Sequence, residues 1–195
     1  MPIVYKSCGT GDGKLEHFCD PCAESELGRV RGAAFIKKSY MAFDEDGNID
    51  KAKIETEEFW TTGIENGDII VVPKTSGTYD GGTPKTGKGY GDVKEKTLGK
   101  DFIVSLTDPN HTQNEEFWNS MEKAADGYYL AFRTATELRI SEKPISSVTA
   151  KDNVEEDTDT EVVWVAEVKW FQARGTVRIF SMNALKNVFE CFEVT

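Results

Sequence analysis

The sequence predicts a mainly β (α+β) protein with one β-rich domain and one or two short helices. Short apolar runs at residues 69–73 and 162–166 have the length of buried strands. Helix signals are confined to residues 56–66 and 113–126, where acidic residues open the segment and a glycine follows it. Strand signals therefore outnumber helix signals along the chain.

The chain of 195 residues suits one domain with extensions, and 38% hydrophobic residues are enough to bury a core. Residues 1–27 are rich in glycine and cysteine and predict an N-terminal arm, so the domain is expected at residues 28–195. Residues 74–91, rich in Gly, Thr and Lys, predict a long functional loop. Residues 44–50 predict a hairpin turn. Strands are expected at residues 30–40, 68–74, 97–106, 128–136, 137–141, 144–154 and 161–171.

The segment 162–171 is the strongest predicted strand. Its alternation places Val162, Trp164, Ala166 and Val168 on one face, and Val163, Val165, Glu167 and Lys169 on the other. Apolar residues on both faces indicate a strand that is covered on both sides, or one that a neighbouring subunit covers.

The tetrapeptide Glu-Glu-Phe-Trp occurs twice, at residues 57–60 and 115–118. Each copy follows a predicted strand and precedes a glycine and another strand, so a strand–loop–helix–strand unit could occur twice. The alternative is that each Phe-Trp pair simply docks an amphipathic helix onto a sheet.

Cys19-Asp-Pro-Cys22 is the sharpest local motif, because such a turn can present two thiolates to a tetrahedral zinc ion. Cys8 could supply a third ligand, and Cys191 or His17 the fourth. A second close pair, which zinc fingers need, is missing. Structural zinc, free thiols and a disulfide therefore all remain open, and no cofactor is certain.

Two further motifs depart from their patterns at named positions. Residues 44–50 place Ile49 where a calcium loop requires glycine, and Gly89 stands where a phosphate loop requires Ser or Thr. His111 lies in a predicted turn and is expected to be a surface or capping residue. Since no nucleophile has an evident histidine partner, the chain is not expected to be an enzyme.

The net charge of −11 and the pI near 4.7 argue against binding nucleic acid through its phosphates. Residues 155–161 concentrate this charge in a run of Glu, Asp and Thr, which predicts a solvated loop or a negative wall. No long apolar stretch is present, so we expect neither a secretory signal nor a membrane-spanning helix.

Several segments resemble structural proteins of tailed bacteriophages that infect Bacteroidetes, and the order of elements resembles a tail tube protein. The segments are Cys19-x-x-Cys22 with residues 27–38, Gly67-Asp68-Ile69-Ile70-Val71-Val72-Pro73, Gly81-Gly82-Thr83-Pro84 with Gly87-x-Gly89-Tyr90-Gly91, and Val163-Trp164-x-x-Glu167-Val168-Lys169-Trp170.

The resemblance implies a β-sandwich or half-barrel with flanking helices, whose copies form hexameric rings that stack into a tube. It implies a negatively charged lumen through which DNA passes without specific binding, and a place in the virion after synthesis in the host cytoplasm. Partners would be other copies of the chain and other tail proteins, without a membrane. The assembly residues expected are Phe35, Val163, Val165, Trp170, Gly82, Gly87, Gly89 and Tyr90.

Two alternatives remain beside this expectation. Within the structural class, the chain could be a capsid-decorating or head–tail connector protein. From another class, it could be a small metal-binding module built on Cys8, Cys19, Cys22 and Cys191.

Overall fold

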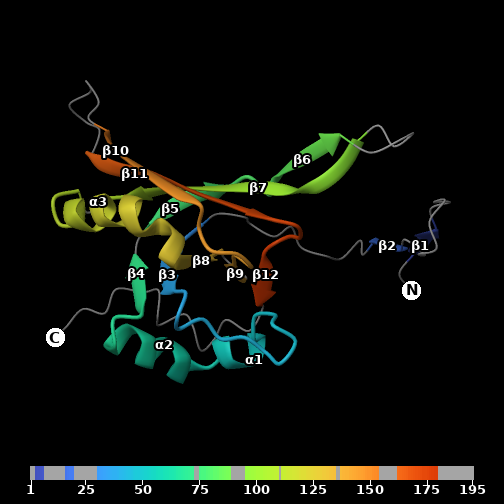
Figure 1. The fold of residues 1–195 in the computed structure, drawn as a ribbon, viewed down its shortest axis with the longest axis horizontal. Helices are drawn as coiled ribbons and strands as arrows, with labels where there is room; N and C mark the ends of the chain where they lie inside the picture. Colours follow the sequence, from blue (N-terminus) through green and yellow to red (C-terminus); the bar gives the residue numbers. More distant parts are fainter. Residues whose placement is uncertain are drawn as a thin grey trace.

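The computed structural model describes residues 3–6, 16–19, 30–72, 75–88, 95–109, 111–134, 137–153 and 162–179 (Figure 1). Its body consists of two antiparallel sheets of five strands each, which confirms the predicted mainly β (α+β) class. We call them the outer sheet, with strand order β10-β11-β7-β5 and β6 also paired to β7, and the central sheet, with order β12-β9-β8-β3-β4.

The outer sheet contains β5 (Ser76–Tyr79), β6 (Thr83–Lys88), β7 (Glu95–Asp108), β10 (Ser147–Asn153) and β11 (Val163–Gln172). The central sheet contains β3 (Gly32–Lys37), β4 (Ile69–Val72), β8 (Tyr128–Arg133), β9 (Leu138–Ile140) and β12 (Val177–Ile179). The helices are α1 (Lys51–Ile54), α2 (Glu57–Glu65) and α3 (Glu115–Ala124), the last continued by a 3-10 turn, η1 (Ala125–Gly127). In the expected arm, β1 (Ile3–Lys6) and β2 (Glu16–Cys19) pair with each other and with no other described strand.

The central sheet is covered on both faces. Along β3, Ala33 and Phe35 face the outer sheet, whereas Ala34 and Ile36 face the layer that contains α1 and α2. All four side chains have no exposed surface. A strand that is buried on both faces needs apolar residues at consecutive positions, which explains the sequence Ala-Ala-Phe-Ile in β3.

Aromatic rings fill the space between the two sheets. Tyr79, Phe102 and Trp170 stack, with ring centroids of Phe102 and Trp170 5.4 Å apart and those of Tyr79 and Phe102 6.1 Å apart. Phe132 of the central sheet contacts Tyr79 at a centroid distance of 5.1 Å. Offset aromatic contacts of this kind add to the apolar area that they bury, so this cluster joins the two sheets.

Helix α2 begins where the sequence predicts. The Thr56 hydroxyl accepts a hydrogen bond from the backbone N–H of Phe59, and Glu57 and Glu58 occupy the first turn. The indole of Trp60 donates to the carbonyl of Ile54 at 2.8 Å, which satisfies its polar atom in the core. These contacts dock α2 on the central sheet (Figure 1).

Helix α3 is held to the outer sheet by Asp108, the last residue of β7. The buried Asp108 carboxylate accepts hydrogen bonds from Asn114 Nδ2 at 2.6 Å and from Trp118 Nε1 at 3.0 Å. Trp118 packs edge-on against Phe35 of the central sheet. One carboxylate therefore fixes the start of the helix and orients its largest core side chain.

The two Glu-Glu-Phe-Trp copies dock helices on sheets, and the predicted order of strand, loop, helix and strand surrounds both of them, but the two units are not equivalent in topology. The helix α2 connects β3 to β4, which are neighbours in the central sheet. The helix α3 connects β7 of the outer sheet to β8 of the central sheet. The two connections differ in topology, so the shared tetrapeptide reflects the common need of an amphipathic helix to bury Phe and Trp.

Two other expectations need correction. Residues 74–91 are not one long loop, because β5 and β6 run along the same side of β7. The strand β11 is not an edge that a neighbouring copy could cover, since β10 and β7 pair with its two sides. The sequence also did not reveal the short elements α1 and β12.

We expect Asp108→Ala to lower the free energy of unfolding by about 2–3 kcal/mol, because it leaves the buried Trp118 N–H without its carboxylate partner. Asp101→Ala is the matched control, since this carboxylate lies on the same strand and is 53% exposed. It should change stability by less than about 0.5 kcal/mol. Urea unfolding of the two variants measures the difference, and equal losses would contradict the role assigned to Asp108.

Candidate assembly surface

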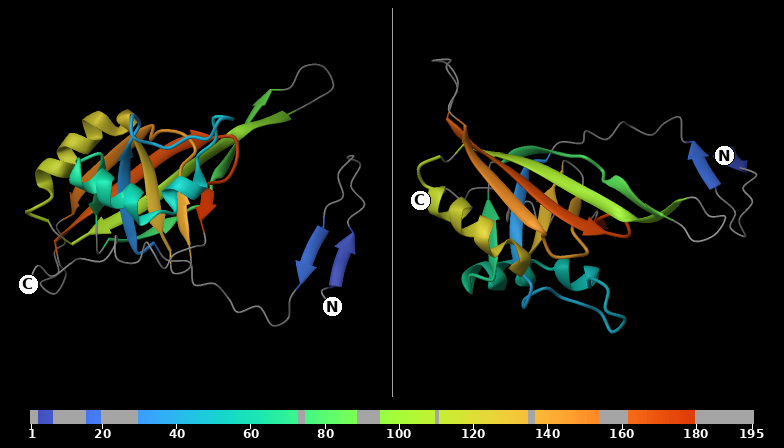
Figure 2. Two further views of the ribbon diagram at one scale, coloured as in Figure 1. Left: turned by 90° about the horizontal axis from the view of Figure 1, so that it is seen from below. Right: turned by 45° about the horizontal axis from the view of Figure 1, so that its top comes forward.

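The β6–β7 hairpin extends beyond the body of the sandwich (Figures 1 and 2). Along β6, Thr83, Pro84, Lys85, Thr86 and Lys88 are exposed, and no described strand pairs with the outer side of β6. A two-stranded ribbon is marginally stable alone in water, and a free strand edge is a template for pairing with another chain. This hairpin is therefore the surface best suited to bind a further strand.

A kink between β5 and β6 sets the direction of the hairpin. The Asp80 carboxylate accepts hydrogen bonds from the backbone N–H groups of Gly82 at 2.9 Å and Ile103 at 3.1 Å. Gly82 has φ +88° and lies against the ring of Phe102. An L side chain rarely adopts this backbone conformation, so glycine is required here.

Apolar and basic side chains gather at the base of the hairpin. The Phe171 ring lies over Gly99 of β7, and Lys85 Nζ lies 5.6 Å from the centre of that ring. Phe171 is 39% exposed and Leu98, farther along β7, is 55% exposed. The hairpin thus offers the exposed apolar side chain of Leu98, and Phe171 of β11 adds another at its base.

The solvent-facing side of the outer sheet carries a mixed set of residues. Val163 and Val165 are half-buried on this face of β11, next to Glu167 and Lys169. Glu167 Oε2 and Lys169 Nζ are 2.8 Å apart, and this contact holds the pKa of Glu167 below its usual value. The described part of this face is therefore not the strongly acidic wall that the resemblance implies for a lumen.

The expected assembly residues fall into three groups. Phe35 and Trp170 are core residues, with 0% and 1% of their surface exposed, so the expectation that they contact another copy is wrong. Val163, Val165, Gly82 and Gly87 lie on the outer sheet and its hairpin, where another copy could reach them. Gly89 and Tyr90 lie outside the described residues.

The proposed zinc ligands are not tested by the described side chains. Cys8, Cys22 and Cys191 lie outside the described residues, and for Cys19 only the backbone pairing with Ile3 is described. Within the described part of the chain, no group of three or more His, Cys, Asp or Glu side chains is placed to hold a metal. None of the described helices is long and apolar enough to cross a membrane.

A basic groove lies at one end of the molecule and was not anticipated from the sequence. It has a volume of about 580 Å³ and is lined by the 43–51 turn, the β9–β10 turn, the β11–β12 turn and β12. Its described charged residues are Lys51, Lys143, Arg174, Arg178 and Glu142. Four cations and one carboxylate around one hollow are unusual for a chain of net charge −11. The four cations are scattered over 128 positions of sequence, so no local pattern marks them.

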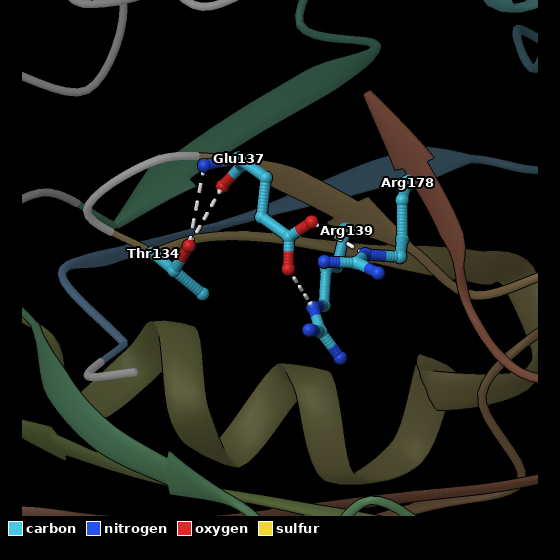
Figure 3. Close-up of polar contacts among 4 residues, drawn as sticks. All are labelled: Thr134, Glu137, Arg139 and Arg178. Carbon is cyan, nitrogen blue, oxygen red and sulfur yellow. Dashed lines mark hydrogen bonds and ion pairs between the residues drawn. The ribbon is translucent and has the colours of Figure 1, made fainter. Parts of the chain in front are cut away.

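A buried ion cluster supports one side of this groove (Figure 3). Glu137 is 1% exposed, and its two carboxylate oxygens accept hydrogen bonds from Arg139 Nε and Arg178 Nε, each at 2.5 Å. The Arg139 guanidinium also lies over the ring of Tyr79, 5.3 Å from its centre. Burial raises the pKa of this tyrosine. Two cations on one carboxylate leave a net positive charge beside the groove.

The buried Gln172 fixes the two turns on the other side. Its side-chain oxygen accepts hydrogen bonds from the backbone N–H of Glu142 at 2.8 Å and from Trp170 Nε1 at 2.9 Å. Its amide nitrogen donates to the carbonyl of Arg174 at 2.9 Å. The positions of Lys143 and Arg174 therefore depend on one amide within the core.

His111 connects the start of α3 to the outer sheet. Its Nε2 lies 2.6 Å from Asp152 Oδ1, its ring stacks on Trp164, and its carbonyl accepts from Trp164 Nε1 at 2.7 Å. The prediction of a surface or capping role did not include these contacts, through which the residue joins β10, β11 and the turn before α3.

No protein-family model matches the chain, and no similar curated protein or solved structure is found for it.

We expect Gly82→Ala to destabilise the protein by about 1–3 kcal/mol more than Gly81→Ala does. Both glycines have positive φ, of +88° and +75°, so both variants incur backbone strain. Only at Gly82 would the new Cβ lie 2.4 Å from Phe102 Cε1, while the space at Gly81 is open. Thermal unfolding of both variants tests this, and equal melting temperatures would show that Phe102 does not restrict Gly82.

Proposed function

We propose that this chain is a self-assembling virion protein of the tail tube type, whose copies form rings that stack into a conduit for phage DNA. One observation carries the proposal: the β6–β7 hairpin projects from the sandwich with an edge that no described strand pairs. Pairing of this edge with a strand of the next copy would continue the outer sheet from subunit to subunit. The resemblance of the sequence to phage tail proteins supports the same function.

The composition of the hairpin favours a selective contact over indiscriminate aggregation. Pro84 lies on the unpaired strand, where a missing N–H is tolerated. Lys85 and Lys88 place positive charges on the same strand, which discourages pairing with another copy of the same edge. A different, less basic edge of the neighbouring subunit is therefore the suitable partner, as a ring with head-to-tail contacts requires.

The outer sheet also suits the wall of a conduit. On its exposed face, Ser105 and Thr149 flank Glu167, which pairs with Lys169, and Thr107 lies opposite Val165. A face with balanced charge and small hydroxyl side chains offers no cluster of cations to neutralise phosphates. DNA could therefore slide along it without being held.

Leu98→Asp should weaken self-association at least roughly tenfold, because it places a charge on the exposed apolar side chain of the hairpin. Ile64→Asp is the control, since Ile64 is 41% exposed on α2, in the layer on the other side of the central sheet. Sedimentation velocity measures the association, and negative-stain electron microscopy shows whether rings or tubes form.

A wild-type protein that stays monomeric at high concentration would argue against the tail tube assignment. Equal association of the Leu98→Asp and Ile64→Asp variants would exclude the hairpin as the contact.

A further inference from the structure

We infer that the basic groove binds the acidic segment of residues 155–161 from a second copy of this chain, and that this contact joins copies head to tail. The inference rests on the proposed function, because it names the contact through which rings stack. It starts from the groove, which is lined by four cations and one carboxylate.

The groove cations are available to a ligand. Lys51, Lys143, Arg174 and Arg178 come from three separate segments and are all exposed. Arg178 is partly neutralised by the buried Glu137, but that carboxylate also binds Arg139. The turns that carry Lys143 and Arg174 are fixed through Gln172. The site is therefore positioned before a ligand arrives, which lowers the entropic cost of binding.

Residues 155–161 have the complementary chemistry. This segment contains five carboxylates among its seven residues: Glu155, Glu156, Asp157, Asp159 and Glu161. A groove that presents amino and guanidinium groups binds carboxylates through charge-assisted hydrogen bonds. No equally dense acidic run occurs elsewhere in the sequence.

The segment cannot reach the groove of its own chain. It lies within the nine residues between Asn153 and Val163. Asn153 and Val163 themselves pair with each other at the ends of β10 and β11. A tether of this length, fixed at both ends, extends less than about 20 Å. The ten residues of β11 span about 30 Å, and Arg174 lies beyond the far end of that strand. Only a second copy can therefore bring the two together.

Described charged residues lie at both ends of the molecule. The end of the molecule that carries the tips of β10 and β11 also holds the start of α3, because His111 contacts Asp152 and Trp164. Glu115 and Glu116 lie in the first turn of that helix. The β6–β7 hairpin lies at the opposite end (Figure 1), and it carries Lys85, Lys88, Lys96 and Lys100 together with Glu95 and Asp101. A contact between the acidic segment of one copy and the groove of the next is heterologous, and such a contact repeats along an axis.

The test reverses charges on each side of the contact. The groove variant carries Lys143→Glu and Arg174→Glu, and the segment variant carries Glu155→Lys and Glu156→Lys. The control, Lys38→Glu with Lys123→Glu, changes the net charge as the groove variant does, at exposed lysines outside the groove. Light scattering and electron microscopy follow ring formation and stacking separately.

Each of the two charge-reversal variants alone should form rings that stack only at a roughly tenfold higher concentration, whereas the control stacks as the wild type does. An equimolar mixture of the groove and segment variants should restore stacking, in alternating order, since each supplies the charge that the other has lost. Raising the salt concentration should weaken stacking of the wild type more than that of the groove variant.

Rings that stack normally in the groove variant would overturn the inference and leave the proposed function standing. A segment variant that stacks normally while the groove variant does not would also overturn it, because another ligand would then occupy the groove. Failure of the wild type to form any ring would instead reject the proposed function.

Discussion

Burial of the central sheet on both faces is the constraint on which the rest of the structure depends. A sheet that faces the outer sheet on one side and α1 and α2 on the other needs mostly apolar side chains along its inner strands, and Arg139 of β9 is tolerated through its contact with Glu137. The sequence of β3, with Ala33, Ala34, Phe35 and Ile36, meets this demand, and its small residues allow the layers to approach closely. Each layer is then held in place through contacts with this sheet.

The outer sheet has a different role because only one of its faces is buried. Trp164, Ala166, Val168 and Trp170 of β11 point toward the central sheet, and the residues between them face solvent. The rings of Phe102 and Trp170 stack within this sheet, and Tyr79 beside them contacts Phe132 of the central sheet. With stability provided on one side, the exposed face and the hairpin remain available for other copies.

The few buried polar groups determine where the surface features lie. Asp108 places α3, Gln172 places the two turns that carry Lys143 and Arg174, and Glu137 holds Arg139 and Arg178. A buried polar group is costly unless all of its partners are present, so each of these side chains permits little variation in geometry. A basic groove therefore has a defined shape, although its own cations lie at the surface.

The sequence by itself determined the mainly β class, the two principal helices and the alternation along β11, because hydrophobic periodicity and helix caps are local signals. It also exposed the failure of the calcium-loop and phosphate-loop motifs, which depend on single positions. Tertiary structure alone decided that Phe35 and Trp170 are core residues, since apolar character does not tell burial within a chain from burial between chains. It alone showed that the glycine-rich segment 74–91 includes two strands, because their pairing partner lies along β7. The groove was likewise invisible, since Lys51, Lys143 and the pair Arg174 and Arg178 meet only when three distant segments converge at one end of the sandwich.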